Sequence, residues 1–168
     1  MADPHIKSPM DYLDYLTVIV YRCGFVLAGM MVLLLPYQPN IAQIGILVAA
    51  VCCASSLHIY LKSFRLLLQC ATWIALLCQI LGFEALALGG TLVTLGGLAF
   101  KEYFCFKVPL LNLQPLFVAL LWFAIQLNIL LATQIISVIV GGLFIILAIQ
   151  KWRMPLHFDI GDKTKYQI

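Results

Sequence analysis

The chain has 168 residues, of which 64% are hydrophobic and only 10% are charged. A water-soluble domain of this size could not bury that much apolar surface, so the composition excludes a soluble protein and predicts a polytopic membrane protein. The net charge of +3 comes from dispersed basic residues rather than from a cluster, and it does not indicate nucleic-acid binding.

Six apolar runs follow one another along the chain, and each approaches the ~20 residues that cross a bilayer. The runs are Leu16–Leu35, Ile41–Leu61, Leu66–Gly82, Ala85–Phe100, Leu110–Leu127 and Leu130–Ile149. They are continuous rather than alternating, which favours helices over membrane strands. We therefore predict an all-α polytopic membrane bundle of six transmembrane helices.

The basic residues indicate the orientation of these helices. All ten Lys and Arg residues precede or open the first run, separate the second from the third or the fourth from the fifth, or follow the sixth. Short cytoplasmic segments carry the excess of Lys and Arg, so both termini are predicted to be cytoplasmic. The expected parts are a cytoplasmic N-terminal segment at 1–15, the transmembrane domain at 16–150 and a cytoplasmic tail at 151–168.

Arg22 is an intramembrane charge in the first run. A helix that enters the membrane near Leu16 puts Arg22 about 9 Å inside it. Its side chain could extend outward to lipid headgroups, because side chains lean toward the N-terminal, cytoplasmic end of this helix. The alternatives are an ion pair with Asp14 or Glu102, or a carboxylate of a partner protein.

Glu84 is the only charged residue expected on the far side of the membrane. It follows Gly82, a residue that commonly terminates helices, and it begins the fourth helix, where the helix dipole favours a carboxylate. Capping this hairpin is therefore the expected role of Glu84. An entry point for a proton or cation is the alternative.

The fourth run carries a stripe of small residues on one helical face. Its members are Ala87, Gly90, Thr94 and Gly97, and Gly89 and Gly96 widen it. Small residues let neighbouring helices approach closely in lipid, so this stripe predicts helix packing. Short, glycine-interrupted spans also occur at transporter substrate sites.

The segment after the fourth run, expected to be a loop, combines aromatic and charged side chains. Its candidate partner-docking residues are Lys101, Glu102, Tyr103, Phe104, Phe106 and Lys107. Aromatic rings at headgroup depth with nearby ammonium groups are typical of membrane anchoring. Docking of another protein or a lipid headgroup is the alternative, and the hydrophilic tail offers a second cytoplasmic surface.

Residues typical of catalysis or cofactor binding are missing from the pattern. The six cysteines form no Cys-x-x-Cys pair, and only one histidine, His58, comes near a span. No Ser-His-Asp, phosphate-loop or His-Glu-x-x-His constellation is present. We therefore expect no catalytic residues, no metal, no cofactor and no enzymatic activity.

Two stretches carry a resemblance to a known family. They are Gly82-Phe-Glu-Ala with Ala99-Phe-Lys-Glu-Tyr-Phe-Cys-Phe-Lys and Pro109, and Trp152-Arg-Met-Pro-Leu with Asp159-Ile-Gly-Asp-Lys-Thr-Lys-Tyr. With the length and the six-span layout, they resemble a family of uncharacterised integral membrane proteins common in cyanobacteria. The resemblance implies a bacterial plasma membrane or thylakoid membrane and brings no established activity. It adds weight to Glu84, to residues 101–106 and to the tail as functional surfaces.

These observations favour a non-enzymatic accessory or assembly factor that packs against a larger membrane complex, with a photosynthetic complex as one candidate. Docking would use the small-residue stripe, the segment Lys101–Lys107 and the tail. The expected partners are the lipid bilayer and that complex, with a homo-oligomer as a further option and no nucleic acid. A small-solute or ion transporter is the alternative function.

Overall fold

The computed structural model of the chain describes residues 9–57 and 59–163. The start of the predicted N-terminal segment, His58 and the last five residues of the predicted tail lie outside this description. Within it the structure is all-helical and contains no strand. The helices are α1 (Tyr12–Leu34), α2 (Pro39–Ser55), α3 (Lys62–Ile80), α4 (Glu84–Phe106), α5 (Gln114–Gln126) and α6 (Leu130–Arg153), with two 3₁₀ turns, η1 (Leu111–Leu113) and η2 (Leu156–Asp159).

Local sequence explains where these helices begin and end. Pro39 opens α2, a position where its missing N–H costs nothing. After α3, Gly82 has a φ of +82°, and the N–H of Phe83 donates to the carbonyl of Cys78 at 2.8 Å. No glycine or proline marks the turn between α5 and α6, but Asn128 adopts a φ of +55°, a conformation that asparagine tolerates better than most residues.

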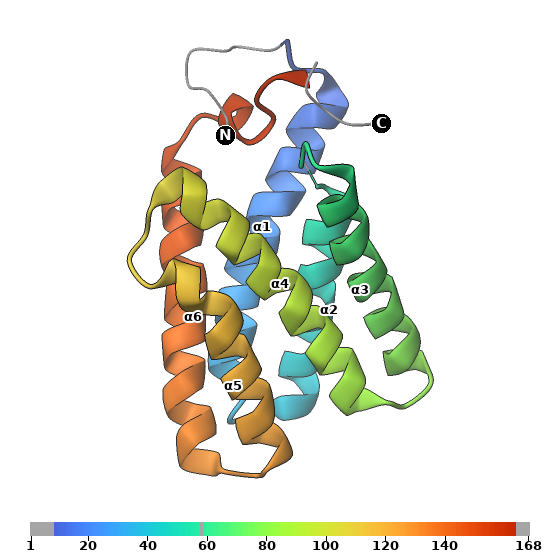
Figure 1. Cartoon of the computed structure of the whole chain (residues 1–168), viewed down its shortest axis with the longest axis vertical. Coiled ribbons are helices and arrows are strands. Elements are labelled where there is room, and N and C mark those ends of the chain that lie inside the picture. The colour runs from blue at the N-terminus through green and yellow to red at the C-terminus, as the bar shows by residue number, and fades with distance from the viewer. Residues whose placement is uncertain (1–8, 58, 164–168) are drawn as a thin grey trace.

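The six helices run alternately down and up and form two layers (Figure 1). In one layer α1 packs between α2 and α6, and in the other α4 packs between α3 and α5. The start of α1, the end of α6 and the α2–α3 connection meet at one end of the bundle. The helix ends and connections that meet there carry basic residues, whereas the α1–α2, α3–α4 and α5–α6 turns at the opposite end carry none.

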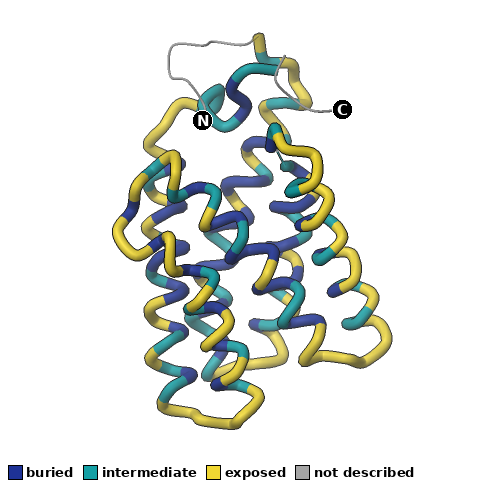
Figure 2. Tube along the Cα trace, in the orientation of Figure 1, coloured by how far each residue is buried: buried dark blue, intermediate teal, exposed yellow. Residues whose placement is uncertain are grey.

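The exterior of the bundle is strongly apolar, as well as its core. Large apolar side chains such as Leu131 and Ile80 are mostly exposed, and exposed residues cover the outer helices in Figure 2. In contrast, Arg22, Glu102 and Lys151 are almost completely buried. By length and composition, α1, α3 and α6 are able to cross a membrane, whereas α2 and the η1–α5 segment are shorter. The 13 residues of α5 extend only ~20 Å.

Gly29 of α1 and Gly141 of α6 let these two helices approach each other closely. A Cβ on Gly141 would lie 2.7 Å from Cγ of Leu33 and 3.0 Å from the carbonyl oxygen of Gly29. A Cβ on the neighbouring Gly142 would meet nothing within 4 Å. Such close approach of small residues is a main source of attraction between helices in lipid.

This contrast predicts different effects of two adjacent substitutions. Gly141→Ala should be about 1 to 3 kcal/mol less stable than Gly142→Ala, because only the first overpacks the α1–α6 contact. Both variants gain the same helix propensity, so the second is a matched control. Unfolding of the purified variants in mild detergent measures the difference, and equal stabilities would contradict this account of the contact.

Candidate functional site

Arg22 of α1 is held by the segment that follows α6. Its Nε donates to Oδ2 of Asp159 at 2.6 Å, and its Nη1 and Nη2 donate to the carbonyl oxygens of Met154 and Pro155 at 2.8 and 2.9 Å. The side chain is therefore turned into the protein rather than toward lipid headgroups. Its ion pair is with Asp159 and with neither Asp14 nor Glu102, the two acids that the sequence offered as alternatives to lipid headgroups.

Glu102 of α4 accepts hydrogen bonds from three groups, one of which is the hydroxyl of Tyr21, the residue before Arg22. Its Oε1 accepts hydrogen bonds from the Tyr21 hydroxyl at 2.7 Å and from Nζ of Lys101 at 3.0 Å. Its Oε2 accepts from Nζ of Lys151 at 3.0 Å, and Lys151 also forms an ion pair with Asp159. A continuous ionic network of Arg22, Asp159, Lys151, Glu102 and Lys101 thus joins α1, α4, α6 and η2, and we call it the ionic network.

The electrostatics of the ionic network follow from its burial. The Glu102 carboxylate is buried, and the ammonium groups of Lys101 and Lys151 and the hydroxyl of Tyr21 offset the cost of removing its charge from water. The Nζ of Lys151 also lies 4.9 Å from the centre of the Tyr21 ring, a distance at which the ring face attracts a cation.

The segment Lys101–Lys107 is helical instead of forming the expected loop. It continues α4 to Phe106, and Lys107 ends the helix with a φ of +49°. The reason is tertiary, because Glu102 reaches its partners on α1 and α6 from this extension of the helix. Of the other predicted docking residues, Tyr103 and Phe106 are half-buried, whereas Phe104 is 49% exposed.

The predicted helix-packing stripe faces α3 of the same chain. A Cβ on Gly90 would lie 2.9 Å from Cβ of Ala75, and one on Gly97 would lie 2.9 Å from the side chain of Leu68. Thr94 and Thr72 share a hydrogen bond of 2.8 Å between their hydroxyls. Ala87 belongs to the same face and is buried. The stripe is therefore occupied by an intramolecular contact.

Glu84 lies at the opposite end of the bundle from the ionic network. It is the first residue of α4 and is exposed. The side chain of Gln43 on α2 donates to its backbone carbonyl at 2.9 Å and to Oε1 of Gln79 at 2.9 Å. Arg22 and Glu84 therefore do not belong to one site.

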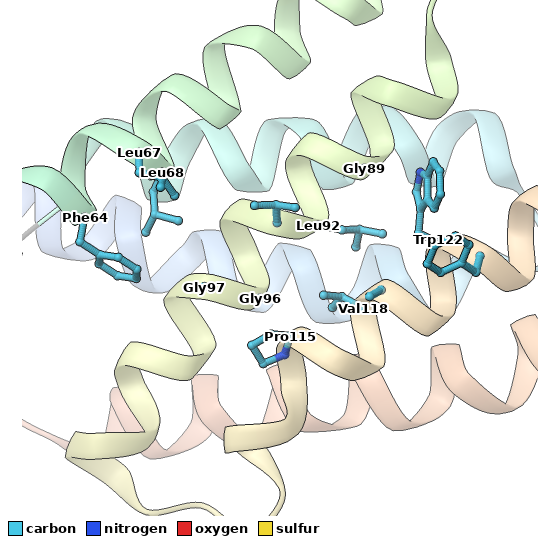
Figure 3. Close-up of a pocket in the computed structure, with 13 residues that line it drawn as sticks. Phe64, Leu67, Leu68, Gly89, Leu92, Gly96, Gly97, Pro115, Val118 and Trp122 are labelled. Carbon is cyan, nitrogen blue, oxygen red and sulfur yellow. The ribbon is translucent and has the colours of Figure 1, made fainter.

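An apolar groove that the sequence did not reveal lies on the outer face of α4 (Figure 3). Its volume is about 380 Å³. Gly89, Gly96 and Gly97 of α4 form its floor, with Phe64 of α3 and Trp122 of α5 among the residues of its walls. In the sequence, Gly89 and Gly96 beside the predicted stripe were the only indication of this groove.

Residues 9–57 and 59–163 hold no cluster of His, Cys, Asp and Glu suited to a metal ion.

The burial of the ionic network predicts a large effect of neutralising one of its carboxylates. Glu102→Gln should destabilise the protein by about 3 to 5 kcal/mol, because Lys151 would remain buried with less opposite charge around it. Glu84→Gln makes the same chemical change at an exposed position and should change stability by less than about 0.5 kcal/mol. Unfolding in mild detergent compares them, and a Glu102→Gln protein as stable as the control would show that the network contributes little.

Comparisons with known proteins agree with the membrane character of the chain. A family model described as "Uncharacterized integral membrane protein (DUF2301)" matches residues 81–168, which include both stretches that carried the resemblance. The chain is 71% identical over 168 residues to an "Uncharacterized protein" of Haemophilus influenzae, with 100% of both chains covered. No solved structure matches. This relative does not support a specifically cyanobacterial setting, but the chain belongs to the DUF2301 family of integral membrane proteins.

Proposed function

We propose that the protein is a non-enzymatic, multi-pass membrane protein that acts as an accessory or assembly factor beside a larger membrane complex. The observation that carries this proposal is an exposed stripe on a rigidly held helix end. Phe100 and Phe104 follow one another at i and i+4 on α4 and so share one helical face, and the exposed Lys107 comes directly after the last residue of the helix. We call these three residues the docking stripe.

Rigidity supports a binding role for the docking stripe. Glu102, on another face of the same turns, is fixed by the ionic network, so the helix end loses little further entropy when a partner binds. The rings of Phe100 and Phe104 pack edge to face with centroids 5.2 Å apart, which presents them as one surface. Aromatic side chains such as those of Phe100 and Phe104 are enriched at protein interfaces.

The proposal includes a topology of six spans with both termini in the cytoplasm of a bacterium. Its support is the alternating direction of the helices and the basic residues at the end where α1 begins and α6 ends. Single cysteines placed at Asn40, Glu84 and Asn128 in a cysteine-free protein should react with an impermeant reagent added outside intact cells. A cysteine at Lys107 should react only after the membrane is opened, and the reverse pattern would overturn the topology.

The docking stripe predicts which substitutions release a partner. A tagged protein extracted in mild detergent should migrate with a stoichiometric membrane complex on a native gel, and Phe104→Ala combined with Lys107→Gln should abolish this migration. Phe83→Ala removes an exposed aromatic ring at the opposite end and should leave it unchanged. A wild-type protein that migrates alone, or a complex indifferent to the double variant, would contradict the proposal.

A small-solute transporter is the second candidate function. It is favoured by two buried polar atoms that have no hydrogen-bond partner in the described part of the chain, Oε1 of Gln114 and Oγ of Ser137. The amide nitrogen of Gln114 donates to the carbonyl of Val140, which lies one turn beyond Ser137. The test is the uptake of a panel of small solutes into proteoliposomes. Uptake that Gln114→Met reduces, and that Asn112→Met at a nearby exposed position leaves unchanged, would favour transport over the accessory function.

A further inference from the structure

The apolar groove on α4 is built by two pairs of glycines. Gly90 and Gly97 lie against α3, whereas Gly89 and Gly96 lie against α5, where a Cβ would meet the Trp122 indole at 3.1 Å and the Val118 side chain at 2.8 Å. Each pair is spaced by seven residues, or two helical turns. The two pairs seat α3 and α5 on either side of α4, and the outer surface of α4 is left between them as the floor of the groove (Figure 3).

The dimensions of the groove favour a narrow occupant. Its floor extends from Gly89 to Gly97, a length of ~12 Å along the helix axis. A volume of about 380 Å³ over this length corresponds to a channel roughly 6 Å wide. A transmembrane helix with its side chains is ~10–12 Å thick and could place only a few side chains there. A single hydrocarbon chain, with carbon contacts at ~4 Å, fits along the whole length.

The surroundings of the groove indicate the charge of the occupant. Its lining is almost entirely apolar, and in an integral membrane protein an outward-facing groove of this kind meets lipid. At the end near Phe64 the flanking residues are basic. Lys62 and Arg65 lie within one turn of Phe64 in the first two turns of α3. Basic residues at the mouth of an interhelical pocket are the arrangement that binds anionic lipid headgroups.

We propose that this groove binds one acyl chain of an anionic phospholipid, whose phosphate lies beside Lys62 and Arg65. The apolar walls supply the affinity for the chain and the cations supply the preference for the headgroup. The site is separate from the docking stripe and does not depend on a protein partner.

Native mass spectrometry of the full-length protein tests this site. After delipidation, the protein is mixed with phosphatidylglycerol or with phosphatidylethanolamine carrying the same acyl chains. We expect one phosphatidylglycerol per chain, retained about tenfold or more over phosphatidylethanolamine. Ala119→Phe fills the groove from an exposed position of α5 and should abolish retention. Leu120→Phe, at the next residue and outside the lining, should leave retention intact.

Neutralising the cations tests the headgroup separately from the chain. Lys62→Gln combined with Arg65→Gln should remove the preference for phosphatidylglycerol, whereas Arg153→Gln on α6 should not. Thermal unfolding of each variant verifies that it is folded. The proposal would be overturned if the wild type retained the two lipids equally or if Ala119→Phe left retention unchanged. It would also be overturned if the wild type held no lipid and formed a dimer that Ala119→Phe dissociates.

Discussion

The arrangement of the helices depends on pairing charges that are withdrawn from water. Arg22 and Lys151 come from two of the three helices of one layer, Glu102 comes from the other layer, and Asp159 follows α6. Moving any one of these elements away would leave a buried charge without its counter-ion, which costs several kcal/mol. Apolar packing in lipid is weakly directional, so the ionic network is the constraint that distinguishes this arrangement from other packings of the same helices.

Helix α4 connects the ionic network with the surfaces available to other molecules. Near its C-terminal end Glu102 fixes it to α1 and α6 while Phe104 remains exposed on another face. Along its middle, glycines facing α3 and α5 bring both neighbours close and leave the groove between them. A rigid α4 therefore presents the docking stripe at one end and the preformed apolar groove at mid-length. Neither surface needs much reorganisation when another molecule binds to it.

Much of the fold could be predicted from hydropathy, because a continuous apolar run in lipid has to satisfy its own backbone hydrogen bonds as a helix. The helix order and most boundaries follow from Pro39, Gly82 and similar local signals. The end of α4 could not be predicted in this way. Lys101 and Glu102 look like interface residues of a loop, yet Glu102 has its partners on α1 and α6, and these partners extend the helix.

The sequence by itself determined the class of the protein, its apolar helices and the positions of its unusual charges, since each depends on residues close together in the chain. Only the tertiary structure decided what those charges and glycines contact. Arg22 and Asp159 are separated by 137 positions, and the groove combines residues of three helices. Such contacts depend on how helices pack in three dimensions, and neither spacing nor hydropathy along the chain carries that information.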